Sequence, residues 1–144
     1  MSSVEELRAN RPAQAAQARI CAVIAAVLWV PVIGGLVVPE TPDSYAGLPA
    51  IAAVLHAWGS FGVVKGRQSG RVVCVVTAVV LWVMVLPYSW IGMSSDDTYA
   101  SVYAVLDLVA VALSVAGIAL QFSRPVTEYV NAVSHAMRAQ DETR

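Results

Sequence analysis

The chain has 144 residues, of which 58% are hydrophobic and 13% are charged. Soluble domains average roughly 45–50% apolar and 25% charged residues, so this composition excludes an ordinary soluble globule and indicates an integral membrane protein. The formal net charge of −1, without a basic stripe along the chain, argues against a nucleic-acid partner.

The chain begins with a polar, alanine-rich arm at residues 1–18, and four apolar segments follow at 20–38, 45–64, 72–93 and 99–122. A helix of about 20 apolar residues is long enough to cross the hydrocarbon core of a bilayer. We therefore expect an all-α membrane protein with a bundle of four transmembrane helices within residues 19–122. Small residues at 46, 50, 53, 57 and 60 share one face of the second segment, where another helix can approach closely.

The loops between these segments alternate in charge. Lysine and arginine occur in the arm, in the central loop 65–71 and in the tail. The two remaining loops carry only acidic charges, at Glu40, Asp43, Asp96 and Asp97. The positive-inside rule therefore predicts a multi-pass protein of the cytoplasmic membrane with both termini in the cytoplasm.

The tail at residues 123–144 has the pattern of an amphipathic helix. Ser123 is placed to cap its N-terminus. One side of the helix collects apolar residues at helical spacing, namely Val126, Val130, Val133 and Met137. We expect this side to rest on the membrane surface or to dock a partner.

A ten-residue stretch near the start of the first span occurs again in the third. The sequences are CAVIAAVLWV at 21–30 and CVVTAVVLWV at 74–83, with seven of ten residues identical. Each copy opens an apolar pair of segments, which predicts two tandem two-helix hairpins. Trp29 and Trp82 occupy equivalent places in the middle of their spans, away from the interfacial belt, and are expected to fill the bundle core.

Two ionisable residues lie deep in the spans, and the repeat relates them. His56 ends the sequence AVLH, and Asp107 ends the sequence AVLD. We expect them at similar depth, close enough to pair, with Ser60, Tyr103 and Ser114 completing a polar site. A charged residue at the bilayer centre costs about 2.5–3.5 kcal/mol on insertion scales, so something must offset that cost.

Two interpretations of this polar site remain open. Asp107 can act as glue between helices or subunits, hydrogen-bonded to Tyr103, Ser114 or His56. Alternatively, His56 and Asp107 can handle an ion, a proton or a small ligand.

Catalytic and metal-binding motifs are missing from the sequence. Ser60, His56 and Asp107 have the composition of a catalytic triad, but a serine four residues after a histidine in an apolar helix is unspecific. The two cysteines, Cys21 and Cys74, fit neither a disulfide framework nor a zinc site, and no cofactor is expected. An intramembrane lipid-modifying enzyme is the remaining catalytic alternative.

The third span resembles the SPW-repeat membrane proteins. Trp82, Pro87 and Gly92 match the tryptophan, proline and glycine of that pattern, while Leu86-Pro87-Tyr88 stands where the family has Ser-Pro-Trp. The resemblance implies tandem two-helix units over residues 20–122 and implies no activity. The alanine- and valine-rich composition is typical of a bacterial, in particular an actinobacterial, protein.

The leading functional prediction is a non-enzymatic accessory, assembly or interaction module in the lipid bilayer, acting as a homo-oligomer or as a subunit of another membrane complex. The alternative is a small ion, proton or small-molecule transporter or channel that uses His56 and Asp107.

Overall fold

The computed structural model describes residues 4–37 and 43–141, with side chains described for 4–37 and 47–140. Every element in these ranges is helical. In chain order the elements are α1 (Val4–Ala9), α2 (Ala13–Val32), the π-helical turn η1 (Ile33–Val37), α3 (Asp43–Val64), α4 (Gln68–Met93), α5 (Thr98–Gln121) and α6 (Arg124–Asp141).

Four helices are long and apolar enough to cross a membrane, which confirms the predicted number of spans: Ala13–Val37, Gly47–Val64, Gln68–Met93 and Thr98–Gln121. The first begins earlier than expected, within the predicted arm. Pro12 stands at the N-cap of α2 with extended backbone angles, and the alanine-rich stretch after it has high helix propensity. The arm is therefore split into a short helix and the first turns of α2.

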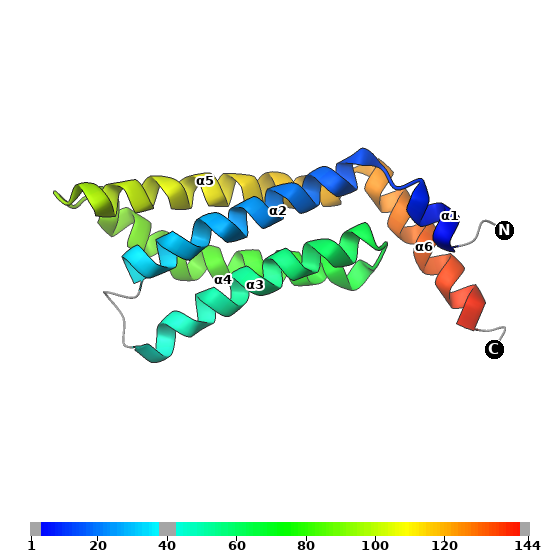
Figure 1. Ribbon diagram of the computed structural model, residues 1–144, viewed down its shortest axis with the longest axis horizontal. Coiled ribbons are helices and arrows are strands. Elements are labelled where there is room, and N and C mark those ends of the chain that lie inside the picture. The colour runs from blue at the N-terminus through cyan, green and yellow to red at the C-terminus, as the bar shows by residue number, and fades with distance from the viewer. Residues whose placement is uncertain (1–3, 38–42, 142–144) are drawn as a thin grey trace.

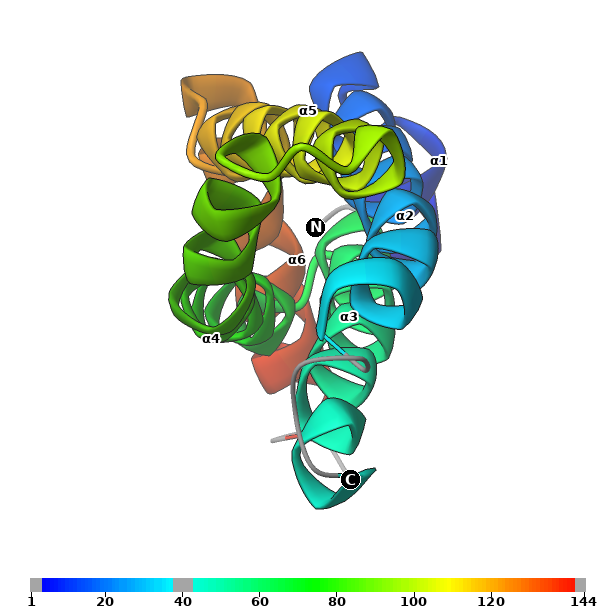
Figure 2. The same ribbon diagram turned by 90° about the vertical axis from the view of Figure 1, so that its left-hand side faces the viewer.

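The four spans form an antiparallel bundle. Figure 2 shows them around a ring in the order α2, α5, α4, α3. Contacts are most extensive between α2 and α5 and between α3 and α4. We name the two ends of the bundle by their loops: the proximal end carries α1, α6 and residues 65–67, and the distal end carries the turn at residues 94–97 (Figure 1).

Glycines set the close approach of α3 to α4. A Cβ atom on Gly70 would lie 2.6 Å from the carbonyl oxygen of Gly59 and 2.6 Å from the amide nitrogen of Val63. A Cβ atom on Gly62 would in turn lie 3.0 Å from the Cα atom of Gly70. The face of α3 that packs most closely on another helix is therefore the glycine face, and not the alanine face that the sequence suggested.

Trp29 lies at the centre of the bundle core. Its side chain is fully buried and packs in one cluster with Leu81 and Val85 of α4. Trp82, the equivalent residue of the second copy, is partly buried and packs against the edge of the same cluster.

The helices α1 and α6 form a second small core at the proximal end, which we call the platform. Its buried residues come from both helices, from the start of α2 and from the end of α3: Val4, Ala15, Val63, Val126, Tyr129, Val130 and Val133. Met137 is partly buried beside them. Figure 1 shows α6 set at an angle to the spans, with α1 alongside it.

The apolar side of α6 is therefore already occupied, which corrects the prediction that it faces a partner or the membrane. The reason is that α1 brings Val4 and Leu7 onto the same surface. Two further contacts join α6 to the end of α3 and to the loop after it. The Tyr129 hydroxyl donates a hydrogen bond of 2.7 Å to the Val64 carbonyl, and Gly66, at φ +74°, lies against Val133.

Burial raises the pKa of the Tyr129 hydroxyl, and the positive charges of Arg8 and Arg11 oppose that shift in part. The hydroxyl consequently stays protonated at neutral pH and keeps its role as the donor to Val64.

Candidate functional site

Six polar side chains from all four spans meet inside the bundle, and we call this set the polar clamp. Its members are Trp29, His56, Thr77, Ser89, Asp107 and Ser114. In a hydrocarbon environment each polar group has to find its partner within the protein. The clamp meets that requirement through hydrogen bonds between helices.

Asp107 joins α5 to α2 and α4. The indole nitrogen of Trp29 donates a hydrogen bond of 2.8 Å to its Oδ1, and the hydroxyl of Ser89 donates one of 2.6 Å to its Oδ2. The carboxyl group is fully buried. The partners expected from the sequence, Tyr103, Ser114 and His56, were wrong. The carboxylate sits at the level of Trp29 and Ser89, so these side chains reach it instead.

His56 joins α3 to α4 and α5. Its Nδ1 lies 3.1 Å from the carbonyl oxygen of Cys74 and 3.3 Å from Oγ1 of Thr77, and its Nε2 lies 3.3 Å from Oγ of Ser114. A carbonyl oxygen can only accept, so Nδ1 carries the proton. The Ser114 hydroxyl then donates to Nε2, and a neutral imidazole satisfies both sides of this contact.

Trp29 separates the two ionisable residues. Its ring stands edge-on to the His56 imidazole, with 5.7 Å between the ring centroids and 77° between the planes, while its N–H is bonded to Asp107. His56 and Asp107 are thus linked through an indole and make no direct pair.

The prediction of similar depth for these two residues was also wrong. His56 contacts Ser114, which lies seven residues after Asp107 on α5, a separation of about 10 Å along the helix axis. Part of this difference comes from where the two residues stand in their helices. His56 follows the first residue of α3, Asp43, by 13 residues, whereas Asp107 follows the first residue of α5, Thr98, by nine, which accounts for about 6 Å.

The remaining predicted site residues lie outside the clamp. The hydroxyl of Ser60 donates to the carbonyl of Ala57 in its own helix, at 2.6 Å. Tyr103 packs its ring against Gly35 of η1. The serine, histidine and aspartate that resembled a triad in composition are therefore not assembled into one.

Sequence reasoning overlooked Thr77 and Ser89. The available signal in the sequence was a hydroxyl residue in an otherwise apolar third span. In the structure both side chains are buried. A third partner, the carbonyl of Cys74, had no sequence signal because every residue carries a carbonyl.

Replacing Trp29 by phenylalanine should lower the free energy of unfolding by roughly 1–2 kcal/mol. The phenyl ring keeps most of the packing, but Oδ1 of Asp107 loses its donor in a site that excludes water. Reversible unfolding in mixed micelles measures this difference.

Trp82 provides the matched control. Its indole nitrogen is buried and has no hydrogen-bond partner, so Trp82→Phe should change the free energy of unfolding by less than about 0.5 kcal/mol. Equal losses for the two substitutions would show that ring volume, and not the bond to Asp107, sets the effect.

The side chains that the structure describes contain no group of three or more His, Cys, Asp or Glu residues that could hold a metal ion. Cys21 and Cys74 are both free thiols. No family model, curated protein or solved structure matches the chain, so its resemblance to the SPW-repeat proteins stays a prediction.

Proposed function

We propose that this protein is a non-enzymatic membrane module that acts as an accessory or assembly subunit of a larger membrane complex. The observation that carries the proposal is that the side chains of the polar clamp are hydrogen-bonded to one another and to the backbone inside the bundle. His56 and Asp107 both form their hydrogen bonds with other helices of the same chain. Such bonds stabilise the helix arrangement and leave His56 and Asp107 without a free polar surface.

The alternative, a transporter or channel using His56 and Asp107, receives less support. A proton or ion moving between these residues would have to pass Trp29, because the hydrogen bonds of His56 and Asp107 run to other partners. Trp29 occupies the space between them, with its ring against His56 and fully buried.

The outer side of the platform is the surface we assign to a protein partner. The apolar side of α6 is covered within the chain, so its polar side is the one left exposed: Glu128, Asn131, His135, Arg138 and Gln140. If both termini lie in the cytoplasm, as the positive-inside rule predicts from the loop charges, this surface would meet a cytoplasmic partner or the cytoplasmic part of a membrane complex.

Each proposed hairpin carries one contact between an arginine and a phenylalanine at the proximal end. The guanidinium of Arg19 on α2 lies 5.4 Å from the centre of the Phe61 ring on α3. The guanidinium of Arg71 on α4 lies 5.4 Å from the centre of the Phe122 ring, directly after α5. The same pair of residue types thus joins the two helices of each hairpin, but Phe122 is not the repeat equivalent of Phe61, and the proposed tandem repeat rests on the matching stretches at 21–30 and 74–83.

The test combines crosslinking and transport. A photoreactive residue at Asn131 or His135 should give discrete protein adducts in native membranes. The same residue at Val83, whose side chain is 70% exposed on the side of the bundle, should give none of these adducts. Purified protein in liposomes should add no proton flux to that of empty liposomes. Flux that Asp107→Asn abolishes, without platform adducts, would replace this proposal with the transport function.

A further inference from the structure

A groove of about 460 Å³ opens on the side of the bundle between α2 and α3. This volume falls within the range of roughly 300–1,000 Å³ found for ligand clefts. All of the residues that line it are apolar, and the alanines among them leave the hollow: Ala26, Ala50, Ala53 and Ala57. The groove lies along the spans, so in a membrane it faces the hydrocarbon.

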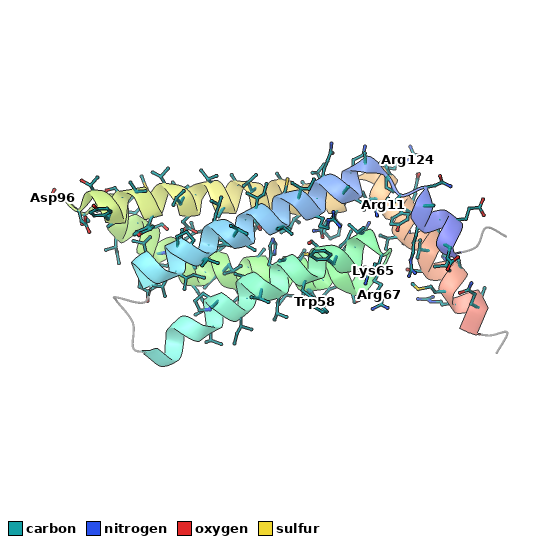
Figure 3. All side chains as sticks on the ribbon, viewed as in Figure 1. Arg11, Trp58, Lys65, Arg67, Asp96 and Arg124 are labelled. Carbon is teal, nitrogen blue, oxygen red and sulfur yellow. The ribbon has the colours of Figure 1, made fainter. Side chains whose placement is uncertain are left out.

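The groove leads toward a basic mouth at the proximal end. A second hollow of about 290 Å³ shares Trp58 and Phe61 with the first and is completed by Gly62, Lys65 and Arg67. Figure 3 shows Trp58, Lys65 and Arg67 following one another along the proximal part of α3 and the loop after it.

A third cation stands at the same mouth. The guanidinium of Arg19, from α2, lies 5.4 Å from the centre of the Phe61 ring that both hollows share. Among the side chains that the structure describes, none of Arg19, Lys65 and Arg67 forms an ion pair with a carboxylate. The ion pair found among those side chains joins Arg124 to Glu128 within α6. Arg19 thus lies beside a residue that both hollows share, and Lys65 and Arg67 line the second hollow, so three positive side chains lie at the proximal end of the groove.

We propose that the α2–α3 groove binds one anionic phospholipid. An acyl chain occupies the alanine-lined part, and the phosphate lies among Arg19, Lys65 and Arg67. Basic pockets between helices at the end of the spans are suited to anionic head groups, and tryptophans such as Trp58 favour the membrane–water interface. The proposal depends on the groove and its charges and is independent of the function of the platform.

Charge complementarity favours a lipid over a helix of a second copy. An apolar helix would fill the alanine-lined part equally well but would leave the three cations without a counter-charge. A lipid phosphate supplies that charge at the point where the groove ends.

The experiment measures lipid retention by native mass spectrometry of the full chain in mild detergent. The probes are phosphatidylglycerol and phosphatidylcholine with identical acyl chains. The wild-type protein should retain phosphatidylglycerol in preference, and Lys65→Gln with Arg67→Gln should reduce that preference roughly tenfold because each cation near the head group contributes to binding. Arg11→Gln with Arg138→Gln removes the same charge from exposed sites elsewhere and should leave the preference unchanged.

A second variant tests the apolar part of the site. Ala50 lines the groove and is exposed, so Ala50→Phe should fill the hollow without disturbing the core and should lower retention of both lipids. Brominated phosphatidylglycerol should quench the fluorescence of Trp58, and the part of the signal that comes from Trp58 is the part that disappears in Trp58→Phe. This quenching should be weaker in Ala50→Phe than in the wild type. Equal retention of the two lipids by the wild type would overturn the proposal. A second result would also overturn it: the wild type forms an oligomer, and Ala50→Phe dissociates that oligomer without changing lipid retention. The groove would then be a contact between copies of the chain.

Discussion

Asp107→Ala should lower the free energy of unfolding by about 3 kcal/mol. The substitution strands two buried donors, the indole N–H of Trp29 and the hydroxyl of Ser89, and each stranded donor costs roughly 1–3 kcal/mol. The bilayer offers no water to replace the lost acceptor. Reversible unfolding in mixed micelles, compared with the wild type under the same conditions, measures the loss.

Asp107→Asn separates the hydrogen bonds of this residue from its charge. The amide oxygen can still accept from Trp29, and the amide nitrogen can donate to the hydroxyl oxygen of Ser89, which rotates to accept. The loss should therefore stay below about 1 kcal/mol, close to the value of one interhelical hydrogen bond in a membrane protein. A loss as large as that of Asp107→Ala would contradict the clamp and would point to the carboxylate charge as the property that matters.

Gly70→Ala should be about as damaging, with an expected loss of about 3 kcal/mol. The added Cβ atom would lie 2.6 Å from backbone atoms of α3, namely the carbonyl oxygen of Gly59 and the amide nitrogen of Val63. Backbone cannot rotate away as a side chain can, so α3 and α4 have to separate, and overpacking of this kind costs 1–3 kcal/mol or, occasionally, more. The contact of His56 with Cys74 and Thr77 spans the same pair of helices and should weaken with it.

Gly47→Ala is the matched control for that substitution, since it makes the same chemical change within α3. A Cβ atom on Gly47 would meet nothing within 4 Å. The substitution should leave stability unchanged or raise it by about 0.5–1 kcal/mol, because alanine is the better helix former. If both glycine variants behaved alike, close packing of α3 on α4 would not be what stabilises this part of the bundle.

These two predictions address the two forces available to helices in a bilayer. Lipid tails are as apolar as the side chains of the spans, so burial of apolar surface does little to bring the helices together. Close van der Waals contact at Gly59, Gly62 and Gly70 supplies one source of attraction. The hydrogen bonds around His56 and Asp107 supply the other and also specify which helix faces meet.

The spans could be predicted from the sequence because their cause is local. A run of about 20 apolar residues forms a membrane helix whatever its neighbours are, so the number of spans and their approximate ends followed from hydropathy. The ends that differed are those where flanking residues extend a helix, as the alanines after Pro12 do for α2. His56, Asp107 and Trp29 could likewise be recognised as core residues, since ionisable and indole groups in mid-span need internal partners.

Only the tertiary structure decided which partners these residues have. A hydrogen bond between helices depends on the rotation of each helix about its axis and on its shift along that axis. Both are set by packing, here by the glycine contacts of α3 with α4 and by the indole of Trp29 between His56 and Asp107. The same holds for the apolar side of α6. Periodicity predicted the side itself, but α1, more than a hundred residues away in the chain, covers it through a contact that no local pattern contains.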